Sequence, residues 1–253
     1  MMKADKKKRK LPIKILAAAL PVCLIAGMFF AYTSTYYRAD DTAQAALMTD
    51  DKVTVGRTDY GYLFDGPSET DALIFYPGGK VEETAYAPML RSLAEGGVDV
   101  CLVKMPFRLA VFGKDKAESV ISETEYERYY IGGHSLGGVM ASSFAEGNSD
   151  KFRGVIFCAA YPIGKLPDGL FCLSVYGSND GVLNMDKYED AKIYFPHDFT
   201  EVVIEGGNHA GFGSYGAQEG DLDGEITALK QQEQTVGEIL SKINSEKNAT
   251  AEE

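Results

Sequence analysis

Tyr129-Tyr130-Ile131-Gly132-Gly133-His134-Ser135-Leu136-Gly137-Gly138-Val139-Met140 is the most informative stretch of the chain. A short apolar run breaks there into a Gly-x-Ser-x-Gly pentapeptide, and a helix-like run follows at once. Strand, sharp turn and helix in this order are typical of a nucleophile elbow, in which a strained turn exposes the serine. Gly133 and Gly137 leave room where the strand and the helix nearly touch. A plain glycine-rich turn has the same pattern, so the rest of the sequence must distinguish the two.

Short apolar runs of strand length lie on both sides of the pentapeptide and alternate with helix-like segments. This alternation predicts an α/β fold, with a mostly parallel central sheet flanked by helices. The expected strands are 52–57, 61–65, 72–76, 98–105, 129–132, 154–161, 170–176 and 201–205. The expected helices are 85–95, 109–122, 136–146 and 226–243. Partial alternation in the first two strands indicates an antiparallel pair at the edge of the sheet.

A serine hydroxyl needs a base to take its proton, and the base needs an acid to orient it. The chain has three histidines. His134 lies inside the elbow, where the turn directs it away from the hydroxyl of Ser135, and His197 precedes the last strand in a surface loop. His209 follows the last strand in a glycine-rich loop, which is the best place for the base.

The acid is expected between the serine and the histidine, just beyond a strand. Asp180 occupies this position in the segment Tyr176-Gly177-Ser178-Asn179-Asp180-Gly181. The competitors are Asp186, in an expected helix, and Asp198, directly after Pro196-His197. The sequence therefore favours Asp180.

An oxyanion hole requires backbone N–H groups that point at the developing negative charge. One comes from the residue after the nucleophile, here Leu136. The second is expected from Pro77-Gly78-Gly79-Lys80, after the third strand. Proline has no N–H, so Gly79 is the better candidate and Lys80 the next; the alternative is a simple glycine turn.

Together these motifs resemble the alpha/beta-hydrolase superfamily, in particular its compact, lid-poor bacterial group, the alpha/beta hydrolase fold-5 domain. The resemblance covers about residues 73–236 and implies Ser135 as nucleophile, Asp180 as acid and His209 as base. It does not identify the substrate. It rests on Tyr76-Pro77-Gly78-Gly79-Lys80-Val81, Lys104-Met105-Pro106-Phe107, Gly132-Gly133-His134-Ser135-Leu136-Gly137-Gly138, Gly177-Ser178-Asn179-Asp180-Gly181 and Gly206-Gly207-Asn208-His209-Ala210-Gly211-Phe212-Gly213.

One departure from many members of the superfamily is the short segment 161–170, which leaves no room for a large cap domain. We therefore expect a shallow, open substrate pocket. Candidate lining residues lie in loops at the expected catalytic edge, and each could equally be a packing residue. They are Lys80, Phe107, Tyr161, Phe212 and Tyr215.

Seven basic residues in segment 1–14 precede an uncharged, mainly apolar run over 15–37. About 20 apolar residues can span a bilayer, and a basic flank stays in the cytoplasm. The sequence thus predicts a transmembrane signal-anchor helix over 15–37, a linker over 38–51, an extracytoplasmic hydrolase domain over 52–245 and a polar tail over 246–253. The alternative is secretion after cleavage of a signal peptide, but the apolar run is long and lacks a good cleavage site.

The composition excludes several partners. The net charge is −12, and because residues 1–40 hold eight basic and two acidic residues, the remainder has a net charge of −18. Because this part of the chain is strongly acidic, it repels phosphate backbones, and nucleic acid is an unsuitable partner. Neither a cofactor nor a metal is expected, since no Cys or His spacing suggests a metal site. Cys101, Cys158 and Cys172 are interpreted as core residues, with a Cys158–Cys172 bridge as the alternative.

These observations predict a membrane-tethered serine hydrolase that cleaves a carboxylic ester or thioester, small or lipid-like, through an acyl-enzyme. Two alternatives stay open. One is an acyltransferase that uses the same three residues, and the other is a hydrolase-like surface protein that binds without turnover. The oligomeric state is not predicted.

Overall fold

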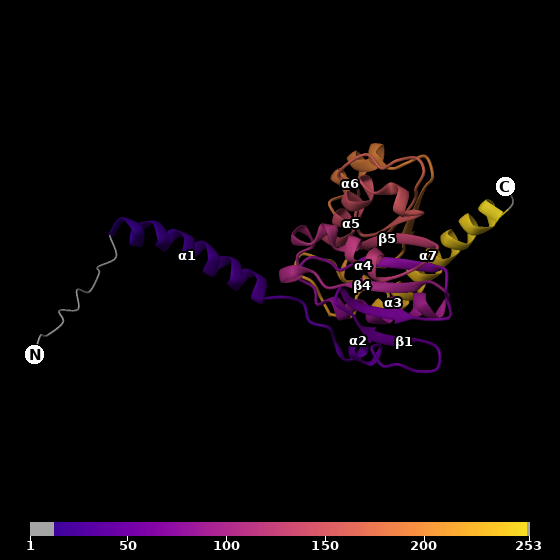
Figure 1. Ribbon diagram of the computed structural model, residues 1–253, viewed down its shortest axis with the longest axis horizontal. Coiled ribbons are helices and arrows are strands. Elements are labelled where there is room, and N and C mark those ends of the chain that lie inside the picture. The colour runs from indigo at the N-terminus through magenta and orange to yellow at the C-terminus, as the bar shows by residue number, and fades with distance from the viewer. Residues whose placement is uncertain (1–12, 252–253) are drawn as a thin grey trace, which may run out of the picture. The chain divides into compact units, whose positions relative to one another are not determined.

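The computed structural model describes residues 13–251, and the chain divides into two compact units between Tyr36 and Tyr37. Helix α1 (Ile13–Ser34) belongs to the first unit (Figure 1). The transmembrane helix predicted over 15–37 is wrong, because no helix among the described residues combines the length and the apolar character that crossing a membrane requires. The predicted location outside the cytoplasm remains a prediction.

The second unit is built around one eight-stranded sheet in the order β1-β2-β4-β3-β5-β6-β7-β8. The first two strands and the β2–β4 pair are antiparallel, and all other neighbours are parallel. The mostly parallel sheet and its antiparallel edge are therefore confirmed. The strands are β1 (Thr54–Arg57), β2 (Gly61–Asp65), β3 (Asp71–Tyr76), β4 (Asp99–Val103), β5 (Arg128–His134), β6 (Gly154–Cys158), β7 (Phe171–Gly177) and β8 (Phe199–Ile204).

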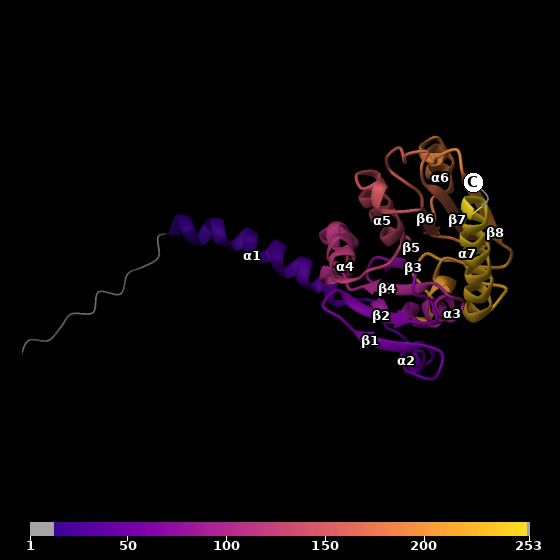
Figure 2. The ribbon, with the colours of Figure 1, turned by 45° about the vertical axis from the view of Figure 1, so that its right-hand side comes forward.

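Helices cover both faces of the sheet (Figure 2). One face packs against α3 (Ala87–Glu95) and α7 (Ala228–Ala251). The other packs against α4 (Ala117–Glu123), α5 (Leu136–Glu146) and α6 (Met185–Ala191).

Strand β3 illustrates why these segments become central strands. Leu73 and Phe75 belong to the apolar cluster that includes α3 and α7, and Ile74 and Tyr76 belong to the cluster on the α5 face. Every residue of β3 is buried. A strand covered on both faces needs a continuous apolar run rather than alternation, which is the pattern seen in the sequence.

The cysteines predicted to be core residues are buried free thiols. The register of β6 and β7 places Cys158 opposite Val175 and Cys172 opposite Val155, so the two thiols are not cross-strand partners. Burial raises the pKa of Cys158 to about 12. The thiols contribute to packing rather than to a disulfide.

Two segments differ from their expected structure. The helix expected over 109–122 begins only at Ala117, as α4, and its first part is replaced by two short 3₁₀ turns, η3 (Ala110–Phe112) and η4 (Lys114–Lys116). Another 3₁₀ turn, η2 (Pro106–Arg108), comes directly before them. Phe107 and Arg108 have positive φ angles, so the chain is not helical directly before the expected segment. The 3₁₀ turn η4 follows Gly113, whose extended φ of −149° also interrupts a helix.

Parts of the expected linker 38–51 and residues 246–251 of the expected polar tail are helical. Helix α2 (Asp41–Ala45) lies in the former linker, because the Asp40 carboxylate caps it by accepting from the N–H of Ala43 at 2.9 Å. Ala43 is fully buried. Helix α7 runs to Ala251.

Candidate active site

Ser135 lies between β5 and α5 with φ 51° and ψ −125°, a conformation that side chains rarely adopt. Two glycines make this turn possible. A Cβ atom on Gly133 would lie 2.5 Å from the carbonyl oxygen of Tyr76, and one on Gly137 would lie 2.2 Å from it. The backbones of β3, β5 and α5 therefore approach so closely that only glycine fits, as the elbow pattern predicts.

Asp180 and His209 come together from the loops that follow β7 and β8. The Nδ1 atom of His209 lies 2.9 Å from Oδ2 of Asp180, and both side chains are almost inaccessible to solvent. Oδ1 of Asp180 also accepts from the backbone N–H groups of Val182 (2.9 Å) and Leu183 (2.7 Å). A carboxylate at Nδ1 fixes the ring orientation and the tautomer with the proton on Nδ1.

The other ring nitrogen of His209 is the one that a base would use. Its Nε2 atom is buried and has no hydrogen-bond partner among the described residues. Ser135 lies one residue from His134, whose ring centroid is 4.5 Å from that of His209. The carboxyl ends of β5, β7 and β8 thus bring all three predicted residues to one edge of the sheet.

His134 is buried under His209 rather than turned to solvent. Its Nδ1 atom lies 2.8 Å from the hydroxyl of Tyr86, which accepts from the N–H of Gly78 at 3.0 Å. The hydroxyl can therefore donate to Nδ1. Burial and the neighbouring His209 lower the pKa of His134 well below its usual value, so this ring is neutral. Sequence analysis missed Tyr86, which has no motif around it.

The two predicted oxyanion donors are neighbours. A Cβ atom on Gly79 would lie 3.1 Å from Cδ2 of Leu136. Leu136 begins α5, and the first N–H groups of a helix lack an acceptor within the helix and carry partial positive charge. Lys80 does not fit the role, because its N–H donates to the carbonyl of Arg108 at 2.8 Å. Gly79 is therefore the better of the two alternatives.

The predicted pocket residues fall into two groups. Phe212 and Tyr215 are buried, and Phe212 packs on His134 with ring centroids 5.5 Å apart. Phe107 is 46% exposed, and Lys80 and Tyr161 are half-buried. Only the second group lies where a substrate could reach, so Phe212 and Tyr215 are placed for packing.

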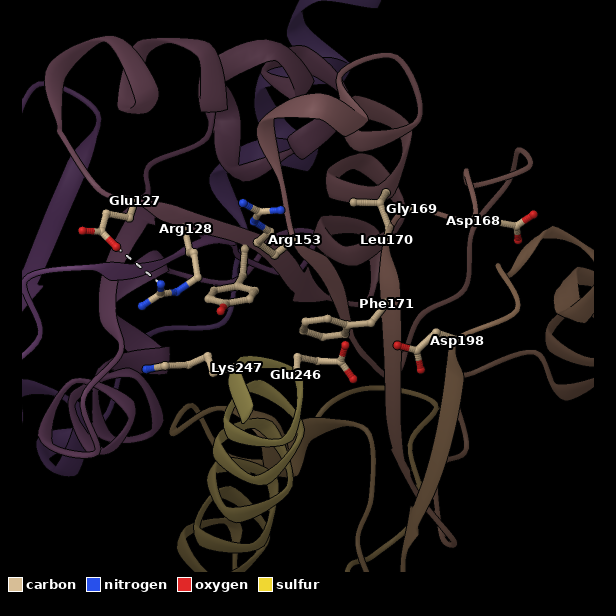
Figure 3. Close-up of a pocket in the computed structure, with 11 residues that line it drawn as sticks. Glu127, Arg128, Arg153, Asp168, Gly169, Leu170, Phe171, Asp198, Glu246 and Lys247 are labelled. Carbon is tan, nitrogen blue, oxygen red and sulfur yellow. Dashed lines mark hydrogen bonds and ion pairs between the residues drawn. The ribbon is translucent and has the colours of Figure 1, made fainter. Parts of the chain in front are cut away.

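A cavity of about 510 Å³ lies at the opposite edge of the sheet, around the amino ends of β5, β6 and β7 (Figure 3). Most of its lining residues are charged, and Tyr130, Leu170 and Phe171 form its apolar part. Because Ser135 follows the carboxyl end of β5, this cavity is remote from the elbow. Among the residues that the structure describes, no group of His, Cys, Asp or Glu could hold a metal ion.

The alpha/beta hydrolase family model matches residues 72–233. The chain belongs to this family. No curated protein sequence matches it.

Three solved structures illustrate the fold of the family. Est1E from Butyrivibrio proteoclasticus is 15% identical, with a TM-score of 0.54 over 77% of this chain and 100% of that one. A monoacylglycerol lipase from Paleococcus ferrophilus is 15% identical, with a TM-score of 0.55 over 75% and 99%. TT1662 from Thermus thermophilus is 17% identical, with a TM-score of 0.52 over 75% and 98%. At such identities the likeness concerns the fold.

Alpha/beta hydrolases often carry a cap between strands, and this chain has only turns between β6 and β7, over residues 159–170. No cap is therefore inserted over the catalytic edge at this point, and the shallow, open pocket stays a prediction.

Proposed function

We propose that this chain is a serine hydrolase that cleaves carboxylic esters or thioesters through an acyl-enzyme. The observation that carries the proposal is the contact of 2.9 Å between Nδ1 of His209 and the carboxylate of Asp180, beside the strained turn of Ser135. The monoacylglycerol lipase among the similar folds supports an ester as substrate.

Acylation begins when Nε2 of His209 takes the proton of the Ser135 hydroxyl as its oxygen attacks the substrate carbonyl carbon. The carbonyl oxygen becomes an oxyanion, which the N–H groups of Gly79 and Leu136 stabilise. The carbon–oxygen or carbon–sulfur bond to the leaving group then breaks, and His209 returns the proton to the departing alcohol or thiol. The Asp180 carboxylate stabilises the imidazolium that exists between these two transfers.

Deacylation repeats the sequence with water. His209 takes a proton from water, the resulting hydroxide adds to the acyl carbon, and the bond to Ser135 breaks. The proton returns to the serine oxygen and the carboxylic acid leaves. The absence of a cap between β6 and β7 favours water as the acceptor over acyl transfer to a second substrate, because it leaves the acyl group open to solvent.

The test is labelling of the purified full chain with a fluorophosphonate, together with hydrolysis of p-nitrophenyl esters of graded chain length. We expect labelling of the wild type, and a fall in ester hydrolysis of at least about 10³-fold in Ser135→Ala. Ser122→Ala is the matched control, because it makes the same change on the exposed surface of α4.

Two results would overturn the proposal. One is a wild-type protein that is neither labelled nor active on any ester, as expected for a binding protein without turnover. The other is equal labelling of Ser135→Ala and wild type, which would place the reaction at another residue.

A further inference from the structure

Asp221 makes an unusual set of backbone contacts beside the candidate triad. Its Oδ2 atom accepts from the N–H of Ala210 at 2.8 Å, and its Oδ1 atom accepts from the N–H of His209 at 3.2 Å. Oδ1 also accepts from the N–H of Gly181 at 3.0 Å and of Leu222 at 3.0 Å. The Asp221 carboxylate thus binds Gly181, directly after Asp180, and it also binds His209 and Ala210.

The loops that carry these residues touch directly, because the N–H of Asn179 donates to the carbonyl of Gly207 at 2.8 Å, and they are joined a second time through the segment that contains Asp221. A Cβ atom on Gly181 would lie 2.8 Å from the carbonyl oxygen of Gly220 and 2.9 Å from the N–H nitrogen of Leu222. The loop after β7 therefore packs directly on the segment that contains Asp221. Hydrogen bonds to an ionised carboxylate are about twice as strong as neutral ones, so this attachment is stiff.

We propose that Asp221 is a positioning residue, which holds the Asp180 loop and the His209 loop at the separation that the Asp180–His209 contact requires. The inference rests on the proposed hydrolase function. Asp221 touches neither the substrate nor the reacting atoms, and acts through the backbone of His209 and Gly181. A small shift of either loop would separate the base from its acid and from Ser135.

The chain offers a matched control in Asp223, two residues further along. Its side chain is exposed and makes no hydrogen bond or ion pair among the described residues. Asp223→Asn removes the same charge from the same segment without changing the contacts between the loops. Asp221→Asn retains one side-chain oxygen that can accept from His209 and Gly181, whereas Asp221→Ala retains none.

The experiment compares wild type, Asp221→Ala, Asp221→Asn and Asp223→Asn as full chains, by steady-state hydrolysis of p-nitrophenyl butyrate and by the rate of fluorophosphonate labelling. Because misplacement by about 1 Å can cost about 10²-fold, we expect Asp221→Ala to lower kcat and the labelling rate by about that factor, with KM within about twofold. The kcat and labelling rate of Asp221→Asn should be about tenfold higher than those of Asp221→Ala, and those of Asp223→Asn should match wild type.

Thermal unfolding of each variant separates positioning from folding, and rates are compared only for variants that are folded at the assay temperature. If Asp221→Ala cannot be assayed folded, the comparison of Asp221→Asn with Asp223→Asn decides. An Asp221→Asn variant with the kcat and labelling rate of Asp223→Asn contradicts the positioning role, as does a loss that lies in KM alone. An inert wild type would instead overturn the proposed function, so the two failures are distinguishable.

Discussion

At the scale of single residues, the elbow depends on positions where a side chain is forbidden. A Cβ atom on Gly137 would lie 2.2 Å from the carbonyl oxygen of Tyr76 and 2.4 Å from that of Pro77, and both are backbone atoms that cannot move aside cheaply. Ser135 has a positive φ angle in the turn between β5 and α5, and α5 lies close against β3 at Gly137. Space around the elbow is therefore as important as the serine itself.

Gly137→Ala is accordingly expected to lower the free energy of unfolding by about 3 kcal/mol or more, and to reduce fluorophosphonate labelling. Gly147→Ala is the control, because a Cβ atom at the end of the same helix meets no atom within 4 Å. Urea unfolding measures both variants. If Gly137→Ala and Gly147→Ala were equally stable, the elbow would not depend on the close approach of β3 and α5.

Asp99 offers a prediction about pH. Its carboxylate is buried and accepts from the N–H of Gly66 and the hydroxyl of Tyr126, each at 2.9 Å. Burial is the main reason that its pKa rises to about 6. A carboxyl group whose pKa is higher in the folded than in the unfolded state stabilises the fold fully below about pH 4, and this contribution is lost as the pH rises through about 6.

Asp99→Asn removes this titration and keeps a side chain of the same shape. The stability of wild type relative to Asp99→Asn should therefore fall by roughly 2–3 kcal/mol between about pH 4 and pH 7. Urea unfolding at both pH values measures the difference, and the exposed Asp115→Asn serves as control. A difference between wild type and Asp99→Asn that does not change with pH would contradict the raised pKa.

At the scale of elements, α7 holds the His209 loop through two buried side chains, Gln231 and Gln232, and Gln232 donates to the carbonyl of Gly211 at 3.4 Å. Gln231 accepts from the N–H of Asn208 at 2.9 Å and donates to its carbonyl at 2.8 Å. A Cβ atom on Gly211 would lie 2.0 Å from the Gln231 oxygen, so this glycine makes room for the contact. The helix thus fixes the backbone on both sides of His209.

Gln231→Ala leaves both backbone groups of Asn208 without their partner. We expect it to lower stability by roughly 1–3 kcal/mol and to slow fluorophosphonate labelling of folded protein, because the His209 loop loses its attachment. Gln234→Ala changes an exposed position on the same helix and should do neither. Labelling as fast as wild type in Gln231→Ala would show that Gln231 does not hold the loop.

The elements also show what the sequence could and could not predict. Buried strands such as β3 and the motifs around Ser135, Asp180 and His209 are local patterns, so they were predictable from neighbouring residues. Gln231 and Asp221 act on His209 from separate positions in the chain, and a single residue outside a motif gives no signal of a distant contact. The 3₁₀ turns before α4 were missed because apolar spacing does not report an extended φ such as that of Gly113.

At the scale of the whole molecule, the two edges of the sheet have different tasks. Ser135, Asp180 and His209 lie beyond the carboxyl ends of the strands. At the amino ends, the buried carboxylate of Asp71 binds Arg128 at 2.7 Å and Lys247 at 3.0 Å, which connects β3, β5 and the end of α7. In the proposed function the first edge carries the chemistry, and the second joins segments far apart in the chain.

Arg128→Ala should therefore affect stability and not catalysis. Burial favours a raised pKa for Asp71, but hydrogen bonds from Arg128, Lys247, Thr70 and Tyr130 outweigh it and hold the pKa well below its usual value. A lowered carboxyl pKa stabilises the fold above the unfolded value of about 4, and this contribution is lost as the pH falls below it. Removing Arg128 strips the buried charge of its bidentate partner and should cost roughly 3 kcal/mol at neutral pH.

The matched control for this change is Arg153→Ala. Arg153 lines the same cavity directly before β6, is exposed, and makes no ion pair among the described residues. Urea unfolding at about pH 7 should give a lower free energy of unfolding for Arg128→Ala than for Arg153→Ala. At about pH 4 this difference should be smaller, because Asp71 begins to take up a proton. Both should keep wild-type kcat while folded, because the whole sheet lies between this edge and Ser135. A fall of kcat in folded Arg128→Ala would mean that the amino edge is coupled to the site, and that the division between the two edges is wrong.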